Sequence, residues 1–495
     1  MEASDHQPAA REGQAGPCEV AERPVVPTKP GNSGGGKGPR FKDNARRGES
    51  REIGVSLSPP ETVRKLQTAL HAKAKGRPGY RFYALYDKVY REDVLAFAYR
   101  CCKANGGAAG VDGQDFEDIE AYGLDRWLGE LAKELKDKTY RPQAVRRVWI
   151  PKPNGQQRPL GVPTIRDRVV QMAAVAVMGP IFEADLPSEQ HAYRPERNAL
   201  GAVQAVHALL NTGHTEVVDA DLSGYFDSIP HAELMKSVAR RISDGALLGL
   251  IKMWLEAPVE EADERGRIRR TTRNKDEGRG TPQGSPLSPL LSNLYMRRFI
   301  LGWKVGGHER RLNAHIVNYA DDFVICCRGT AAEADRVMRA LMKRLKLMVN
   351  DVKTRICRVP EQSFDFLGYT LGRCYSPRTG RAYLGTRPSK RRVQRLCAKL
   401  TEMTGRGGLW RSVERLVGEL NRVLRGWANY FCLGPVSHAY RAVDAHVTTR
   451  LRRWLCEKHK QSSKGYSRYP DRYLAETLGL VRLPLLTRGL LWANA

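Results

Sequence analysis

The sequence predicts an α+β fold that is followed by an all-helical region. Three observations lead to this prediction. Two hairpin patterns, at 145–162 and 316–327, stand among stretches with helical periodicity. An apolar strand pattern that carries acids lies between them at 217–222. Beyond residue 389 the strand patterns end and helical stretches dominate, which indicates a separate helical domain.

Composition restricts the partners of this chain more than its fold. The 495 residues are 41% hydrophobic, enough for a sizeable core, and carry a net charge of +28. A basic excess of this size attracts polyanions, either nucleic acid or an acidic membrane surface. No apolar run of about 18 residues occurs, so no segment is expected to span a membrane. The start of the sequence lacks a basic segment followed by an apolar one, so no secretory signal is expected. The ten cysteines form no C-x-x-C pair, which favours reduced thiols in the cytoplasm.

The order of patterns along the chain predicts five regions. Residues 1–55 are rich in Gly, Pro, Ser and charge, and we expect a disordered basic extension there. A mixed domain covers 56–375, with helices expected within 164–210 and over 290–303 and 331–345. A linker is expected at 376–388, a helical domain at 389–480 and a C-terminal tail at 481–495.

The first hairpin turns at Asn154-Gly155, a pair that strongly favours a two-residue turn. The turn brings Lys152 and Arg158 near each other on opposite strands. A cationic pair on a β-ribbon can hold a phosphate chain, although exposed basic hairpins are common.

Acidic residues follow the other two strand patterns. The strand pattern at 217–222 places Asp219 and Asp221 on the face opposite Val218, Ala220 and Leu222. The second hairpin carries Asp321 and Asp322 at its turn. A divalent cation would explain acids held on stiff strands, while a solvated strand face and an ordinary Asp turn are the alternatives.

The remaining patterns concern a loop and the helical region. Three prolines and two glycines within 280–289 predict a fixed loop around Gln283 and Gly284, after a basic polar stretch at 265–280. Between 389 and 472 there are 19 basic and 6 acidic residues. Aromatic rings are interleaved there and could stack RNA bases or form the core of a helical bundle. These rings are Trp410, Trp427, Tyr430, Phe431 and Trp454.

Taken together, these motifs resemble the reverse transcriptases encoded by bacterial group II introns, over roughly residues 60–480. Tyr319-Ala320-Asp321-Asp322 and Asp221–Asp227 match the two acidic blocks of that family. The segments 151–161, 281–286 and 366–369 resemble its finger, template-side and palm-closing blocks. The segment 420–431 resembles the intron maturase signature, which separates this family from retroviral enzymes. The resemblance implies a right-hand polymerase fold, with fingers and palm followed by a helical thumb and maturase domain.

The resemblance also implies roles for individual residues. Asp221, Asp321 and Asp322 would be catalytic and would bind two Mg²⁺ ions with help from the Leu222 carbonyl, while Asp219 would serve as a counterion. Lys152 and Arg158 would contact the incoming triphosphate, Phe226 would exclude a ribose 2′-hydroxyl, and Gln283 and Gly284 would shape the nucleotide pocket. Lys353 would donate a proton to pyrophosphate, or be an ordinary exposed lysine. Arg422, Arg425 and Trp427 would contact intron RNA.

The implied function is RNA-templated DNA synthesis together with binding of the parent intron RNA, which promotes splicing and retrohoming. The expected partners are group II intron RNA, an RNA template, a DNA primer or target and deoxynucleoside triphosphates (dNTPs), without a membrane. A homodimer is left open. The protein is expected in the bacterial cytoplasm, at the nucleoid as a ribonucleoprotein. Because 481–495 holds no paired cysteines with His or Asn ligands, no DNA endonuclease is expected. The alternatives are a splicing cofactor with a vestigial polymerase site and a reverse transcriptase used in phage defence or a CRISPR system.

Overall fold

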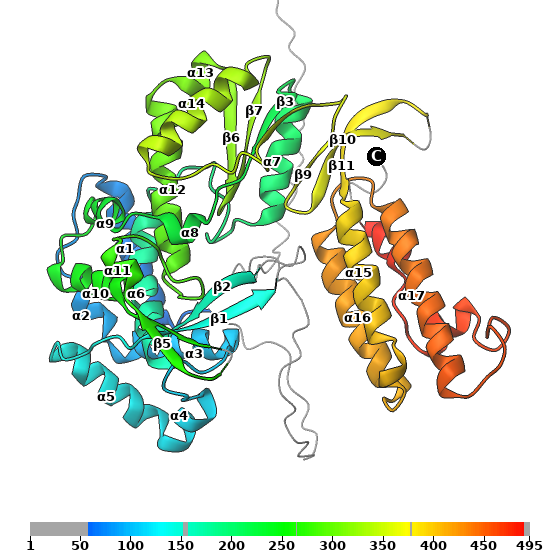
Figure 1. Cartoon of the computed structure of the whole chain (residues 1–495), viewed down its shortest axis with the longest axis horizontal. Coiled ribbons are helices and arrows are strands. Elements are labelled where there is room, and N and C mark those ends of the chain that lie inside the picture. Colours follow the sequence, from blue (N-terminus) through cyan, green and yellow to red (C-terminus); the bar gives the residue numbers. More distant parts are fainter. Residues whose placement is uncertain (1–57, 152–156, 264, 377–378, 490–495) are drawn as a thin grey trace, which may run out of the picture.

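A computed structural model of the chain describes residues 58–151, 157–263, 265–376 and 379–489 (Figure 1). The expected extension at 1–55 lies outside these residues, as do Lys152 and the Asn154-Gly155 turn. The described chain combines helices with three β-sheets, so the mixed α and β composition expected from sequence is confirmed.

Helices build most of the larger body of the molecule. Helix α6 is buried along most of its length and contacts α1, α2, α3 and α12. The helices expected within 164–210 and over 290–303 are present as α6, α7 and α12. The helices of this body are α1 (Glu61–Gly76), α2 (Tyr86–Val89), α3 (Glu92–Asn105), α4 (Phe116–Tyr122), α5 (Leu124–Lys136), α6 (Ile165–Glu183), α7 (Ala199–Asn211), α8 (Tyr225–Ser228), α9 (His231–Ala239), α10 (Gly245–Glu256), α11 (Arg273–Asp276), α12 (Ser288–Val305), α13 (His308–Arg311) and α14 (Ala331–Arg344).

The central sheet has the strand order β6-β7-β3-β8 and is antiparallel throughout. Its strands are β3 (Glu216–Ala220), β6 (Ala314–Tyr319), β7 (Asp322–Cys327) and β8 (Arg355–Arg358). One face, which includes Val218 and Phe323, packs in the same core as α12 and α14. The other face, which includes Val217 and Val324, packs against α7 and the β9–β10 hairpin. Because both faces are covered, the sheet is a firm support for the turns at its ends.

Two smaller sheets flank the central one. The first has the order β2-β1-β4-β5, with β1 (Val145–Pro151), β2 (Gln157–Val162), β4 (Val259–Ala262) and β5 (Ile268–Thr271). It confirms the paired strands of the first hairpin, and part of the polar stretch at 265–280 forms its edge strand β5. The second has the order β11-β10-β9, with β9 (Phe364–Phe366), β10 (Tyr369–Tyr375) and β11 (Ala382–Pro388). The region expected as a linker at 376–388 therefore contains a strand, which pairs with β10 along its whole length.

The C-terminal helices form a bundle beside the rest of the molecule, and the β9–β11 sheet lies between the two (Figure 1). The bundle consists of α15 (Lys390–Met403), α16 (Val413–Tyr430) and α17 (Ser437–Lys458), followed by the short turns η2 (Tyr473–Thr477) and η3 (Leu483–Gly489). Leu483, within the expected tail, is buried in the bundle core. In the described part of the chain, every helix is too short or too polar to cross a membrane. The nine cysteines that this part contains are all free thiols.

Candidate active site

The acids of the second hairpin lie where two central strands meet. Strands β6 and β7 pair from Ala314↔Cys327 to Tyr319↔Asp322, so the expected hairpin is confirmed. Ala320, in the turn, has a left-handed backbone with φ of +59°. The buried Asn318 side chain stabilises this conformation, since its Nδ2 donates to the Ala320 carbonyl at 2.9 Å and the Asp322 carbonyl at 3.3 Å. The turn therefore holds Asp321 and Asp322 in one place.

Asp221 reaches the same end of the sheet from the neighbouring strand. Strands β3 and β7 pair up to Ala220↔Phe323, and continuing this register by one residue sets Asp221 opposite Asp322. Asp219, within β3, pairs with Arg355 at 3.2 Å, which makes it the counterion of a basic partner. Burial raises the pKa of Asp219, and Arg355 opposes this shift.

A segment after α14 surrounds Asp221. Asn350 donates from its backbone to the Asp221 carbonyl oxygen at 2.8 Å and from Nδ2 to the Asp221 Oδ2 at 3.2 Å. Lys353 Nζ reaches the same Oδ2 at 3.1 Å, and Thr354 Oγ1 accepts from the Asp221 backbone N–H at 3.3 Å. Sequence reasoning named Lys353 but missed Asn350 and Thr354, because their contacts join residues about 130 positions apart.

The donor set of these acids fits a hard divalent cation. Asp221, Asp321 and Asp322 supply carboxylate oxygens from two adjacent strand ends, and such oxygens are the ligands that Mg²⁺ prefers. Within the described ranges, no three or more His, Cys, Asp or Glu side chains are gathered closely enough to hold a metal ion. Instead, the Asp221 carboxylate is turned toward Lys353 and Asn350. Both of these bonds use Oδ2, so neither occupies Oδ1.

The loop expected around Gln283 joins the first hairpin to α8. Arg158 Nε donates to Gln283 Oε1 at 2.8 Å, and Gln283 Nε2 donates to Asp227 Oδ2 at 3.2 Å. The Gln283 backbone carbonyl accepts from the N–H of Gly161 at 2.7 Å. Gly284 has φ of +120°, and a Cβ there would lie 2.3 Å from the Gly161 carbonyl oxygen. The close contact of the loop with β2 thus requires glycine at this position.

Phe226 lies on the other side of this loop. It is 7% exposed on α8, and its ring packs edge-on against Tyr225 with ring centroids 5.6 Å apart. Its carbonyl accepts from the Thr281 N–H at 2.7 Å, so loop and helix are joined through the backbone. The pKa of the neighbouring Tyr225 is raised by burial and further by the Asp321 carboxylate.

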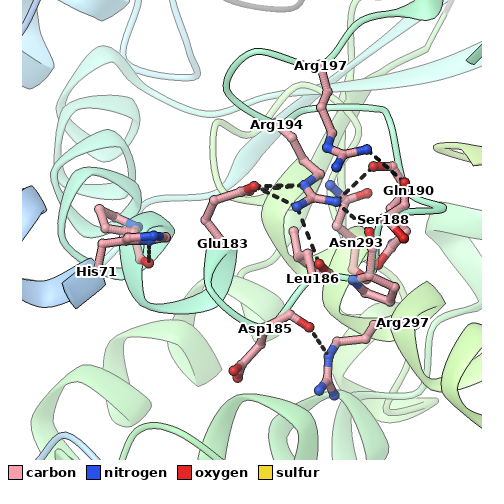
Figure 2. Close-up of polar contacts among 12 residues, drawn as sticks. His71, Glu183, Asp185, Leu186, Ser188, Gln190, Arg194, Arg197, Asn293 and Arg297 are labelled. Carbon is pink, nitrogen blue, oxygen red and sulfur yellow. Dashed lines mark hydrogen bonds and ion pairs between the residues drawn. The ribbon is translucent and has the colours of Figure 1, made fainter. Parts of the chain in front are cut away.

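A buried arginine organises the segment between α6 and α7 (Figure 2). Arg194 is 5% exposed, and its Nη2 and Nε bond the Glu183 carboxylate at 2.7 and 3.0 Å. Its Nη1 also donates to the carbonyls of Pro187 and Gln190. The adjacent Tyr193 has φ of +56°. Burial and then the Asp321 carboxylate raise its pKa to about 12, while Arg158 opposes this shift.

The maturase-signature residues all lie on α16. Arg422 and Arg425 are exposed, whereas Trp427 is only half-buried at the surface and packs against Phe431 and Tyr440 with centroids 4.9 and 5.7 Å away. The Trp427 ring therefore has a packing role, and its expected RNA contact stays a prediction. Tyr430, at the same end of α16, packs against the core cluster that contains Tyr319 and Ala320, the two residues before Asp321. Burial raises the pKa of Tyr430, and Tyr319 and the Asp322 carboxylate add to the shift.

Comparison with known proteins agrees with this arrangement. Residues 150–371 match the family model described as reverse transcriptase (RNA-dependent DNA polymerase). Residues 393–473 match the model described as the group II intron, maturase-specific domain. The class is thus an RNA-dependent DNA polymerase with a domain specific to intron maturases.

Individual relatives extend these matches. Protein YkfC from Escherichia coli is 33% identical over 395 residues, which are 72% of this chain and 99% of YkfC. The group II intron-encoded protein LtrA from Lactococcus lactis is 32% identical over 352 residues, 59% of this chain and 57% of LtrA. A putative COX1/OXI3 intron 1 protein from Saccharomyces cerevisiae is 26% identical over 330 residues, 56% of this chain and 38% of that protein. The chain belongs to the group II intron-encoded family of reverse transcriptases and maturases.

Proposed function

We propose that this protein copies RNA into DNA by two-metal nucleotidyl transfer and that it also binds its parent intron RNA to promote splicing and retrohoming. The single observation that carries the polymerase proposal is the β3–β7 register, which ends at Ala220↔Phe323 in a sheet covered on both faces and, continued by one residue, sets Asp221 opposite Asp322. In this proposal the central sheet and its helices are the palm, β1–β2 belongs to the fingers, and α15–α17 are the thumb and maturase region, with domains at 56–375 and 389–480.

Asp221, Asp321 and Asp322, with the Leu222 carbonyl, would hold two Mg²⁺ ions. When bound, the metal supplies charge stabilisation for an in-line displacement at the α-phosphate of a dNTP. The chain's own residues bind and orient the reactants. Arg158, oriented by Gln283, holds the triphosphate together with Lys152, for which the proposal rests on sequence alone.

Selection of the nucleotide rests on the residues around the loop. The Phe226 ring would close the pocket against a ribose 2′-hydroxyl, and Gln283 and Gly284 would shape its wall. Lys353, on the Asp221 carboxylate, would deliver a proton to the departing pyrophosphate. The RNA template, the DNA primer and the dNTP are the substrates, and the intron RNA is the partner.

The experiment for the polymerase proposal is primer extension on an RNA template with Mg²⁺ and the whole protein. We expect synthesis by the wild type and none by Asp321→Ala/Asp322→Ala, with RNA affinity unchanged because the acids bind metal rather than phosphate. Asp137→Ala, which removes an exposed acid at the end of α5, is the control and should remain active. Synthesis by the double variant would reject the site. No synthesis by the wild type, with tight intron binding, would favour a splicing cofactor.

A second experiment concerns the intron partner. Arg422 and Arg425 lie exposed on α16, where they can reach phosphates. Their replacement by alanine should weaken intron binding and splicing more than primer extension. Lys133→Ala/Lys136→Ala removes the same charge from the exposed face of α5 and serves as the control. Equal losses of splicing and extension would mean that the two arginines only support the fold.

A further inference from the structure

The structure separates the aromatic rings of the helical bundle into core and surface. Trp454 and Phe431 are buried, Trp427 packs between Phe431 and Tyr440, and the Tyr430 hydroxyl donates to the Leu367 carbonyl at 2.7 Å. Trp410, in contrast, is 72% exposed. A tryptophan this exposed keeps a large apolar surface in water, which is typical of a residue that meets a partner.

The loop that carries Trp410 is held firmly in place. Lys458, at the end of α17, donates from Nζ to the backbone carbonyls of Leu409 and Arg411, at 2.7 and 2.8 Å. These are the residues directly before and after Trp410 in the sequence. The next helix begins just after it, and the Ser412 side chain caps α16 by accepting from the Arg415 N–H at 3.2 Å. The indole is therefore presented on a rigid support, and little ordering entropy would be lost when a partner binds.

Arginine side chains flank this ring, and two of them, Arg411 and Arg415, also pair with Glu419 at 3.2 Å. The guanidinium carbons of Arg411 and Arg415 lie 5.7 and 5.9 Å from the ring centroid, within the range of cation–π contact. Arg406, in the same loop, is 80% exposed and pairs with Glu457 at 3.4 Å. An aromatic face bracketed by guanidinium groups matches a nucleotide, whose base stacks on the ring and whose phosphate pairs with the arginines.

A second exposed ring lies at the same end of the bundle. Tyr466 is 58% exposed, and the guanidinium carbon of Arg452 lies 4.2 Å from its centroid. Arg452 is fixed by the Tyr469 carbonyl and by an ion pair with Asp471. Glu457 lines the hollow beside Tyr466 and also pairs with Arg406, in the loop that carries Trp410. The two exposed rings therefore belong to neighbouring parts of the surface.

We infer that this end of the bundle, with Trp410 as its central ring and Tyr466 beside it, binds unpaired nucleotides of the intron RNA. The choice of RNA rests on the proposed function, because residues 393–473 match the maturase-specific domain. We choose unpaired nucleotides because the indole ring can stack only on a base with a free face. A base inside a duplex already has both of its faces stacked on neighbouring bases. The site is distinct from the polymerase site. Trp410 precedes the first turn of α16, whose 18 residues span roughly 27 Å, whereas Tyr430 at the other end of the helix packs against the core that holds the β6–β7 turn.

The test uses the whole protein and measures binding of labelled RNA. Trp410→Ala should weaken binding to a 20-nucleotide single-stranded RNA on the order of tenfold, because base stacking is lost. Binding to a fully paired RNA duplex of the same length should change little. Trp410→Phe, which keeps a ring, should recover part of the affinity. The control is Tyr83→Ala, since Tyr83 is equally exposed, at 71%, on the other body of the molecule.

The outcomes separate this inference from the polymerase proposal. Primer extension on a saturating pre-annealed template should be unchanged in Trp410→Ala, whether or not the acids bind metal as proposed. Unchanged single-strand affinity, or equal losses for single strand and duplex, would overturn the inference. A loss confined to single-stranded DNA of the same sequence, or to an acidic peptide, would overturn it as well. The melting temperature of each variant is recorded, so that unfolding is not taken for lost binding.

Discussion

Replacing Asn350 by alanine tests how Asp221 is positioned. The substitution removes the Nδ2 bond to Asp221 Oδ2 and the two bonds that Asn350 Oδ1 accepts from the N–H groups of Val352 and Lys353, at 3.2 and 3.3 Å. A hydrogen bond to a charged group contributes about 1.5–3 kcal/mol. The Asp221 side chain is 32% exposed, so water replaces part of this contribution and the lower end applies. A loss of about 1.4 kcal/mol corresponds to a tenfold weaker metal affinity.

The assay is the Mg²⁺ concentration that gives half-maximal primer extension, and Mn²⁺ binding measured by electron paramagnetic resonance gives a readout independent of activity. Asn421→Ala is a matched control, because Asn421 also donates to a carbonyl and accepts from a backbone N–H, both at 2.8 Å, but in the helical bundle. Both variants should lose a few degrees of melting temperature, and only Asn350→Ala should need more metal. An unchanged metal requirement in Asn350→Ala, with a melting temperature lowered as in the control, would refute the reasoning.

Three further predictions use the same site and its support. Phe226→Ala should admit ribonucleotides because the blocking ring is gone, and unchanged discrimination in a misincorporation assay would reject the gate. Arg194→Met should lower the free energy of unfolding in urea by about 3–5 kcal/mol, because the Glu183 carboxylate loses the buried guanidinium that neutralises it. A loss under about 0.5 kcal/mol would contradict this. Burial lowers the pKa of His191 in the folded protein to about 4. As the pH falls, this imidazole is therefore protonated in the unfolded chain at a higher pH than in the folded protein. Stability should therefore decline from about pH 6.5 toward pH 4. His191→Asn should flatten this decline, and identical pH profiles would exclude His191 as its source.

The sequence was sufficient for the parts of the site that local patterns define. Apolar runs around Asp321 and Asp322 predicted the β6–β7 hairpin, and alternation along Val217–Leu222 predicted the face on which Asp219 and Asp221 lie. Gln283 was expected in the pocket wall. Its actual partners, Arg158 and Asp227, could not be predicted, because such contacts depend on how distant elements pack.

Other features escaped prediction for identifiable physical reasons. Strand β5 is polar and exposed at the edge of its sheet, so it lacks the apolar alternation by which strands are recognised. The rings of the helical region could not be divided between core and surface, since Trp410 and Trp454 both stand next to arginines and leucines in the sequence while one is 72% and the other 1% exposed. Arg194 lies between α6 and α7, where nothing in the local sequence marks it as a buried residue with several partners.

The seam between the helical bundle and the central sheet has a thermodynamic consequence. Tyr430, on α16, bonds the Leu367 carbonyl, and the Tyr369 hydroxyl donates in turn to the Tyr430 carbonyl. These bonds, together with the Phe431 ring packed beneath Tyr369, make the bundle and the acid-bearing strands share one stretch of core. RNA held by the bundle is then linked to the folding equilibrium of that core, and a concentration 100 times its Kd would add about 2.7 kcal/mol of stability. The RNA partner would thus act as a folding ligand for the catalytic strands, which would be most resistant to unfolding while the ribonucleoprotein is intact.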